Sequence, residues 1–391
     1  MDVQTLFHKP KGITYFDSAA SSLTALPVLE KMQEYYRDYR ANIHRGAHRI
    51  TRKASEEYEA VYGKLAKFFR AGDQEFTAVR NTTEAINGVA LGLDWHAGDE
   101  VVITDNEHHS NLLPWLRLKE KGVKVHAVHS DAQGRFSASN FAPLLSKKTR
   151  LVAFTACSNV LGCKVPVKEI AKAAKDAGAL VLVDAAQYVG HHAVDLKDWS
   201  AVDYLAFSGH KCFGPTGIGA LFHRKGAPLE PWFVGGGTIR EVTLEGYKLL
   251  GHRERFEAGT PAIAEWIGLG AAIDVMSKIG IKSIEAHEDT LAKEMLTEFG
   301  ACEGVTLYGP ADAKEKSSAL FAFNVKGVKH HEAAVMLDSL GFAVRSGHHC
   351  AMPLTKKLGV EGTVRASLHM YNDEGEVRRF GEALKKVAAL G

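Results

Sequence analysis

Short runs of apolar residues alternate with stretches of helical periodicity along the first two thirds of the chain. Near-continuous runs of Val, Leu, Ile and Phe are typical of parallel strands that helices cover on both faces. Strands that alternate with helices predict βαβ units and a mainly parallel sheet. The predicted strands are 76–79, 100–104, 124–128, 151–154, 180–184 and 204–207, with a hairpin partner at 217–222.

The pattern changes near residue 265. Two long helices are predicted there, at 264–279 and 281–299, and shorter strands and helices alternate from residue 319 onward. We therefore expect an α/β protein with a large domain, residues 11–265, and a smaller α+β domain, residues 1–10 together with 266–391.

Composition narrows the classes of function. The 391 residues are 46% hydrophobic and carry a formal net charge of +2, so no electrostatic signature of nucleic-acid or anionic-membrane binding is present. No run approaches the ~20 apolar residues of a membrane span, and the start of the sequence lacks the features of a signal peptide. The five cysteines are dispersed and form no Cys-x-x-Cys motif. We expect reduced thiols in the cytoplasm.

Polar side chains with distinctive chemistry fall where the predicted strands end. Ligands of an open parallel sheet bind at the carboxyl ends of the strands, so we expect these side chains to meet. A lysine, a carboxylate, a hydroxyl pair at a helix start and an imidazole together are what pyridoxal 5′-phosphate requires. The members of the set are Thr82, Thr83, His108, Asn159, Asp184, Gln187, Ser208, His210 and Lys211.

The lysine and the carboxylate of this set have distinct reasons to be functional. Lys211 follows a buried strand in a glycine-containing turn, where its amine could bond to the cofactor aldehyde, although a lone loop lysine is most often solvated. Asp184 ends the most apolar strand, where an unpaired carboxylate is costly. A pyridinium nitrogen would pair with it, and helix capping is the alternative role. Gln187 could donate to the cofactor's phenolate oxygen, and His108 could stack on the ring and transfer protons.

The hydroxyl pair predicts the phosphate site. Thr82 and Thr83 precede a helix, whose N-terminal amides and dipole favour an anion. Capping the helix is the commoner role of such residues. Ser208 and His210 could add contacts to the same phosphate.

Stretches distributed in order along essentially the whole chain resemble one family. They include Ser208-Gly209-His210-Lys211 and Ser346-Gly347-His348-His349-Cys350. The chain resembles the fold-type I enzymes of the aminotransferase class V group, and most closely the SufS-type (group II) cysteine desulfurases and selenocysteine lyases. The matching stretches are 15–21, 42–46, 80–84, 107–111, 158–162, 183–187, 208–211, 255–261, 344–353 and 365–368.

This resemblance implies a fold, a cofactor and an assembly. The fold would have a large, mainly parallel seven-stranded sheet domain and a smaller α+β C-terminal domain. The cofactor would be pyridoxal 5′-phosphate, bonded to Lys211, and the assembly a homodimer in which Thr260 reaches the phosphate held by the other subunit. The implied substrate-binding residues are Asn159, Arg365, Arg345, His44 and Arg45.

The resemblance also places a nucleophilic cysteine at Cys350, on a loop over the cofactor. A glycine, two imidazoles and an arginine in segment 344–349 suit a thiol of lowered pKa, whereas burial as a packing residue is the commoner role of a cysteine. The chain departs from the family pattern at Ala156-Cys157, where the group II enzymes usually have His-Val, so a second thiol could lie near the substrate. Cys163 and Cys212 are expected to be packing residues.

The expected function is therefore that of a cysteine desulfurase. It would convert L-cysteine to L-alanine, hold the sulfur on Cys350 as a persulfide, and pass it to an acceptor or scaffold protein of iron–sulfur cluster assembly. A selenocysteine lyase acting on L-selenocysteine is one alternative, and another class V transaminase or lyase that does not need Cys350 is a second. Histidine doublets such as His108-His109 raise the remote alternative of a metalloenzyme. The sequence has no His-Glu-x-x-His motif or Cys/His box, and no metal ligands are predicted.

Overall fold

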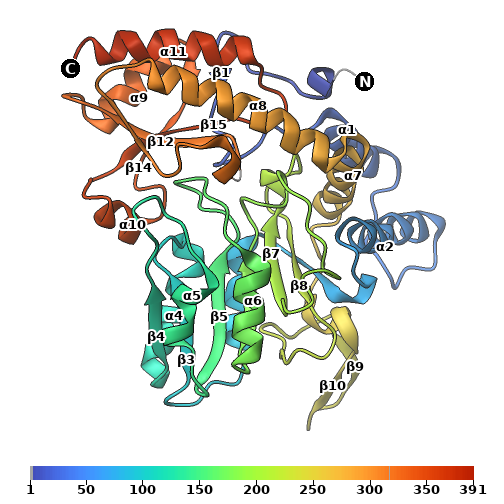
Figure 1. Ribbon diagram of the computed structural model, residues 1–391. Helices are drawn as coiled ribbons and strands as arrows, with labels where there is room; N and C mark the ends of the chain where they lie inside the picture. Colours follow the sequence, from blue (N-terminus) through green and yellow to red (C-terminus); the bar gives the residue numbers. More distant parts are fainter. Residues whose placement is uncertain (1–2, 317) are drawn as a thin grey trace.

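A seven-stranded mixed sheet forms the centre of the larger part of the molecule (Figure 1). The structure, a computed structural model, describes residues 3–316 and 318–391. The strand order is β2-β8-β7-β6-β5-β3-β4, in which β8 runs antiparallel to both neighbours and the other pairs are parallel. The strands are β2 (Phe76–Val79), β3 (Glu100–Thr104), β4 (Lys124–Val128), β5 (Thr149–Thr155), β6 (Leu180–Asp184), β7 (Tyr204–Ser208) and β8 (Gly219–His223). The predicted α/β fold and seven-stranded, mainly parallel sheet are confirmed.

Both faces of this sheet are buried, as the near-continuous apolar runs predict. In β3, Val102 packs in the hydrophobic cluster on one face, and Val101 and Ile103 pack in the cluster on the other. The first cluster includes residues of α1 (Leu26–Asp38), α2 (Arg49–Phe69), α5 (Ala138–Phe141), α6 (Val167–Asp176) and α7 (Ile263–Ile279). The second includes residues of α3 (Thr82–Gly92) and α4 (Leu113–Arg117).

A second, four-stranded antiparallel sheet has its own hydrophobic core. Its order is β11-β12-β15-β14, and residues of α8, α9 and α11 contribute to the same cluster. Residues 342–347 form two short strands, β13 and β14, because the first pairs with β1 and the second joins the four-stranded sheet. The elements are α8 (Ile281–Gly300), β11 (Val305–Tyr308), β12 (Leu320–Val325), α9 (His330–Ser339), β13 (Phe342–Ala343), β14 (Arg345–Gly347), α10 (Met352–Lys357), β15 (Thr363–Ser367) and α11 (Glu374–Ala388).

Segments far apart in the sequence join the parts of the molecule built on the two sheets. Strand β1 (Thr14–Tyr15) pairs in parallel with β13, and α7 packs against α1 and α2. Helix α8 extends alongside α11 in Figure 1. Its first turns reach the core of the large sheet through Ile284, and its later turns reach the core of the small sheet through Leu291. The division into domains 11–265 and 1–10 plus 266–391 stays a prediction.

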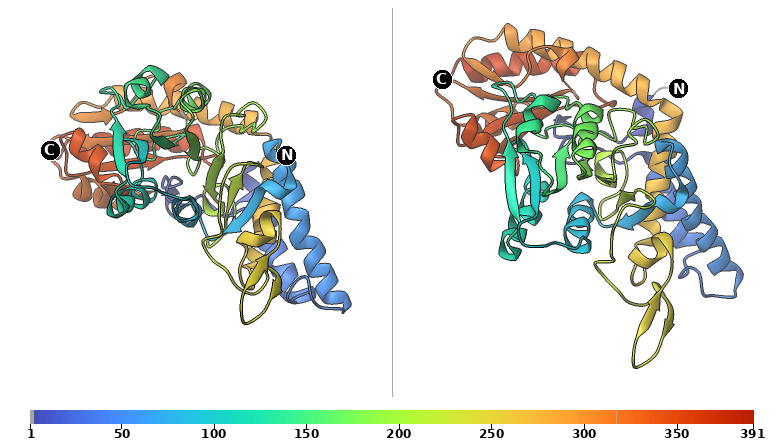
Figure 2. Two further views of the ribbon diagram at one scale, coloured as in Figure 1. Left: turned by 90° about the horizontal axis from the view of Figure 1, so that it is seen from below. Right: turned by 60° about the horizontal axis from the view of Figure 1, so that its bottom comes forward.

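A hairpin of β9 (Ile239–Val242) and β10 (Tyr247–Leu249) projects from the body of the molecule (Figure 2). Val242, Leu244 and Tyr247 on it are exposed. Among the described residues, none of the helices is long and apolar enough to cross a membrane.

Candidate active site

A cavity of about 510 Å³ lies where strands of the large sheet end and segments of the small sheet approach them. Thr260, His44 and Arg45 do not line it. The predicted residues that do are Thr82, Thr83, His108, Asn159, Asp184, Gln187, Ser208, His210, Lys211, Arg345, Cys350 and Arg365. The structure therefore brings together residues that are far apart in the sequence, at the strand ends where ligands of such sheets bind.

Lys211 and Asp184 form the charged centre of the cavity. Lys211 ends a single helical turn directly after β7, and Asp184 is the last residue of β6. Burial lowers the pKa of Lys211 to about 8, against the opposing charge of Asp184. Burial raises the pKa of Asp184, whose Oδ1 accepts a hydrogen bond of 2.9 Å from the Ala186 amide. A buried carboxylate and a buried amine of lowered pKa fit a cofactor that offers a pyridinium nitrogen and an aldehyde.

A cradle of hydroxyl groups lies at the start of α3. Thr82 Oγ1 and Ser208 Oγ lie 2.7 Å apart, and the Thr82 amide also donates to Ser208 Oγ. Thr83 Oγ1 lies 2.7 Å from Ser110 Oγ. Burial and the charge of Lys211 lower the pKa of His210 to about 4, so this imidazole is neutral. Hydroxyls at a helix N-terminus fit the phosphate of the expected cofactor.

His108 is held in one orientation by the turn that follows it. Its Nδ1 accepts a hydrogen bond of 3.1 Å from the Ser110 amide, so the proton of the neutral ring is on Nε2. Burial and the charge of Lys211 lower the pKa of His108 to about 4. Ser110 thus connects the predicted stacking residue with the hydroxyl cradle.

Two side chains that line the cavity have buried polar atoms with no hydrogen-bond partner among the described residues. Arg365 Nη1 donates to the Asn159 carbonyl at 2.8 Å, while the buried Nε has no partner. Asn159 Nδ2 donates to the His349 carbonyl at 2.8 Å, while its buried Oδ1 has no partner. Buried polar atoms are rarely unpaired in native proteins, so these atoms fit a polar ligand. Burial lowers the pKa of Arg365 to about 10, which leaves it charged at neutral pH.

Asp17 joins the two predicted substrate arginines. Arg345 Nη2 donates to Asp17 Oδ2 at 2.8 Å, and Arg365 Nη2 lies 3.4 Å from Asp17 Oδ1. Arg365 is buried whereas Arg345 is exposed. Arg365 is therefore the arginine whose charge is most available to a ligand inside the cavity, because Arg345 is held by three hydrogen bonds to Asp17.

Cys350 lies on the four-residue loop between β14 and α10, and its side chain is exposed at the cavity. His349 and Cys350 both have left-handed backbone conformations, with φ of 50° and 56°. The Cys350 carbonyl accepts a hydrogen bond of 2.7 Å from the His109 amide, which docks the loop beside His108. Two consecutive non-glycine residues in this region are costly, and such strain clusters at functional sites.

The other cysteines and the remaining predicted residues have different surroundings. Burial raises the pKa values of Cys163 and Cys212 to about 12, so both remain thiols. Cys157 is buried and lines the cavity. Gln187 also lines it, and its Nε2 donates to the Ala19 carbonyl at 2.6 Å. His44, Arg45 and Thr260 are exposed around a second hollow of about 620 Å³.

Residues 14–380 match the model of the family described as aminotransferase class V. The chain belongs to this family. A probable cysteine desulfurase from Pyrococcus abyssi is 46% identical over 99% of this chain and 97% of its own length. The apo structure of the cysteine desulfurase from Thermococcus onnurineus is 43% identical, covers 100% of this chain and 98% of its own, and superposes with a TM-score of 0.96. The cysteine desulfurase CsdA from Escherichia coli is 32% identical over 99% of this chain and 98% of its own, with a TM-score of 0.92.

Sequence reasoning gave no role to two residues that organise the site of this class V protein. Asp17 and Ser110 both lie within stretches that resemble the family, at 15–21 and 107–111. Their position in these stretches is the signal in the sequence that could have identified them as site residues. The contacts of Asp17 could not be foreseen, because Arg345 and Arg365 lie 328 and 348 positions further along the chain.

Proposed function

We propose that the protein is a pyridoxal 5′-phosphate-dependent cysteine desulfurase that converts L-cysteine to L-alanine and takes the sulfur onto Cys350 as a persulfide. The observation that carries this proposal is the placement of Cys350, on a strained loop, at the same cavity as Lys211 and Asp184. The relatives named cysteine desulfurase match over nearly the whole chain and support it.

The residues of the cavity divide into groups that would hold the cofactor. Lys211 would bond to it, Asp184 would pair with its ring nitrogen, Gln187 would face its ring oxygen and His108 would stack on the ring. When bound, the cofactor supplies an electron sink for negative charge at the substrate α-carbon. The phosphate would be held by Thr82, Thr83, Ser208 and His210.

The remaining residues would handle the substrate. Arg365 and Asn159 offer unpaired polar atoms to its carboxylate, and Arg345 adds positive charge at the cavity mouth. Lys211 Nζ, with a pKa near 8, can accept and return a proton close to neutral pH. Cys350 Sγ attacks the substrate sulfur, so that the carbon–sulfur bond breaks, a sulfur–sulfur bond forms, and protons complete L-alanine. The balance is L-cysteine plus the Cys350 thiol giving L-alanine plus the Cys350 persulfide.

Replacing Asp184 by asparagine is expected to lower kcat for L-alanine formation by about 100-fold, because a preorganised charge at the ring nitrogen is lost. Burial raises the pKa of Asp184, so ionisation of this carboxyl is disfavoured in the cofactor-free fold. The cofactor-free Asp184→Asn variant should therefore unfold at the temperature of the wild type or above it. A variant with normal kcat would contradict the assignment, and calorimetry of the cofactor-free form controls for misfolding.

We further propose that the protein is of the SufS-type group II, acts as a homodimer in the cytoplasm, and passes its sulfur to an acceptor protein of iron–sulfur cluster assembly. The stretch 344–353, which resembles that group, supports the subtype. The second hollow, with Thr260, His44 and Arg45, and the exposed apolar hairpin support an interface that brings these residues to a partner's cavity. None of the five cysteines, all of which the structure describes, is in a disulfide, which suits a reducing compartment.

The deciding experiment measures alanine and sulfide formed from L-cysteine by the wild-type enzyme, with and without a reductant, beside the same assay with L-selenocysteine. A desulfurase should form alanine from L-cysteine faster when the reductant clears the persulfide. Alanine from L-selenocysteine alone would instead establish a selenocysteine lyase. A protein that binds the yellow cofactor yet forms no alanine from either substrate would overturn both assignments and point to transaminase substrates.

A further inference from the structure

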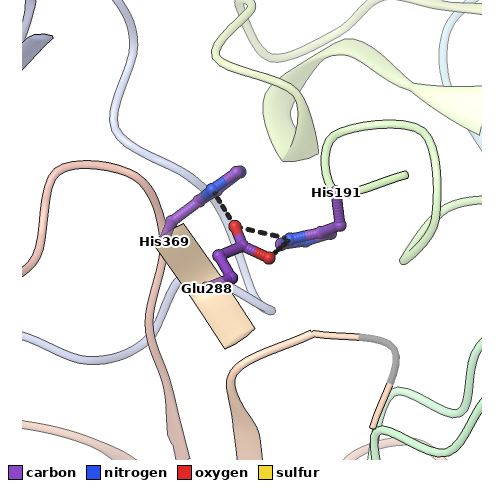
Figure 3. A group of neighbouring side chains, drawn as sticks. All are labelled: His191, Glu288 and His369. Atoms are coloured by element: carbon purple, nitrogen blue, oxygen red, sulfur yellow. Dashed lines mark hydrogen bonds and ion pairs between the residues drawn. The ribbon is translucent and has the colours of Figure 1, made fainter. Parts of the chain in front are cut away.

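Three buried ionisable side chains that do not line the cavity converge from three segments of the chain (Figure 3). His191 lies in the loop after β6, Glu288 on α8, and His369 just after β15. Their exposed fractions are 4%, 2% and 0%. His191 Nδ1 lies 2.8 Å from Glu288 Oε2, and His369 Nδ1 lies 2.6 Å from Glu288 Oε1.

These distances favour direct contact over a bridging metal ion. Metal bonds to imidazole nitrogen and carboxylate oxygen are about 2.0–2.2 Å long, so ligand atoms around an ion normally stand roughly 3 Å or more apart. Here the carboxylate is already in contact with both imidazoles. Burial alone would raise the pKa of Glu288, but the two histidines outweigh it and lower that pKa to about 2. The cluster is thus built around one buried carboxylate anion.

The cluster adjoins the chain at Lys211 and just after it. A Cβ atom at Gly190 would lie 2.7 Å from the Lys211 carbonyl oxygen and 3.4 Å from His369 Nε2, so only glycine fits between them. The His369 ring packs on the ring of Phe213 with centroids 4.3 Å apart. Phe213 itself has a left-handed φ of 64°.

The same three residues join the segments that carry the other cavity residues. His191 follows Gln187 by four positions, and His369 follows Arg365 by four. Glu288 lies on α8, whose first turns pack in the core of the large sheet and whose later turns pack in that of the small sheet. A buried carboxylate in contact with an imidazole from each segment fixes the two segments relative to each other, because removing either imidazole leaves the buried charge of Glu288 with less compensation.

We propose that His191, Glu288 and His369 are positioning residues that hold the Lys211 turn in register with the Arg365 segment. The proposal rests on the proposed function only for its catalytic consequence. The placement of Lys211 that it predicts can be measured without any substrate.

The chain supplies a matched control pair. His192 and Glu285 join the same loop to the same helix, with 2.8 Å between His192 Nδ1 and Glu285 Oε1. Glu285 is on the surface side, with a side-chain exposure of 34% against 3% for Glu288. Glu285→Gln therefore weakens the contact between loop and helix without touching the cluster that packs on Phe213.

The experiment compares Glu288→Gln, His369→Phe and Glu285→Gln with the wild type. His369→Phe keeps an aromatic ring on Phe213 but removes the imidazole nitrogen. Each protein is freed of cofactor, and the rate of pyridoxal 5′-phosphate uptake is followed by absorbance. Holoenzyme kcat and KM for L-cysteine, thermal unfolding and metal content of the purified protein are measured beside it.

We expect Glu288→Gln and His369→Phe to slow cofactor uptake and to lower kcat by between about 10-fold and 100-fold, with KM within about threefold, as displacement of a reacting group predicts. Glu285→Gln should match the wild type. Folded Glu288→Gln and His369→Phe variants with wild-type uptake would overturn the proposal, as would equal losses in Glu285→Gln. One equivalent of metal in the wild type that the variants lose would also overturn it. If the two variants show the expected slow uptake but the wild type has no desulfurase activity, the positioning role stands and the proposed function is overturned instead.

Discussion

Replacing Lys211 by alanine is expected to lower kcat for L-alanine formation by about 10³-fold or more, because a general acid–base group alone contributes about 10²–10⁴. The variant also loses the amine that would bond to the cofactor. Burial sets the pKa of this amine to about 8, so the reactive neutral form increases as the pH rises through that value. Cofactor uptake by the wild-type apoprotein should therefore accelerate with pH up to about 8 and then level off. Absorbance measurements of the bound cofactor between pH 6 and 10, roughly two pH units on either side of that pKa, test the pH dependence of uptake. The rate of L-alanine formation tests the loss of kcat.

Lys316 provides the control for Lys211. It is buried, and burial likewise lowers its pKa to about 8. Its Nζ donates to the carbonyls of Leu161 and Leu320, and it does not line the cavity. Lys316→Met should lower thermal stability while leaving cofactor uptake and its pH dependence unchanged. The assignment of Lys211 fails if Lys211→Ala retains wild-type uptake, or if the two substitutions act alike.

Local patterns predicted much of the fold and part of the site. The strands of the large sheet are apolar on both faces, so each appears in the sequence as an uninterrupted run. The rule that ligands meet at strand ends then grouped Thr82, His108, Asp184 and Lys211, which the structure does bring to one cavity. Helices α1 and α2 were not predicted from the pattern, and neither was the β9–β10 hairpin. The apolar residues of the hairpin are exposed, so they do not follow the alternation of a strand that packs on a core.

Contacts between residues far apart in the sequence could not be predicted from local patterns. The histidine doublets illustrate why: His191 and His192 are neighbours in sequence, yet each pairs with a different glutamate of α8, nearly 100 positions away. Nothing local distinguishes a doublet that joins two segments from one that binds a metal. His348 and His349 belong instead to the loop of Cys350, where the Cys350 amide donates to His348 Nδ1 and the imidazole of His349 lies 2.9 Å from Thr363 Oγ1.

Replacing Cys350 by alanine is expected to lower alanine and sulfide formation from L-cysteine by about 10³-fold, because the nucleophile that receives the sulfur is lost. The loop backbone is docked by the His109 amide on the Cys350 carbonyl, a contact that alanine keeps, so cofactor binding and thermal stability should be unchanged. In the wild type, mass spectrometry after one turnover without reductant should find one additional sulfur atom on the peptide that contains Cys350.

Cys157→Ala is the informative companion to Cys350→Ala, since Cys157 also lines the cavity but is buried, whereas Cys350 is exposed. If sulfur goes directly to Cys350, Cys157→Ala keeps the persulfide peptide and most of the activity. Alanine formed at the wild-type rate by Cys350→Ala would show that the carbon–sulfur bond breaks without this thiol, and the reaction would then be that of a lyase. Loss of activity in Cys350→Ala alone, with selenocysteine still processed, would show instead that the thiol is needed for sulfur and dispensable for selenium, because a selenium leaving group needs less assistance.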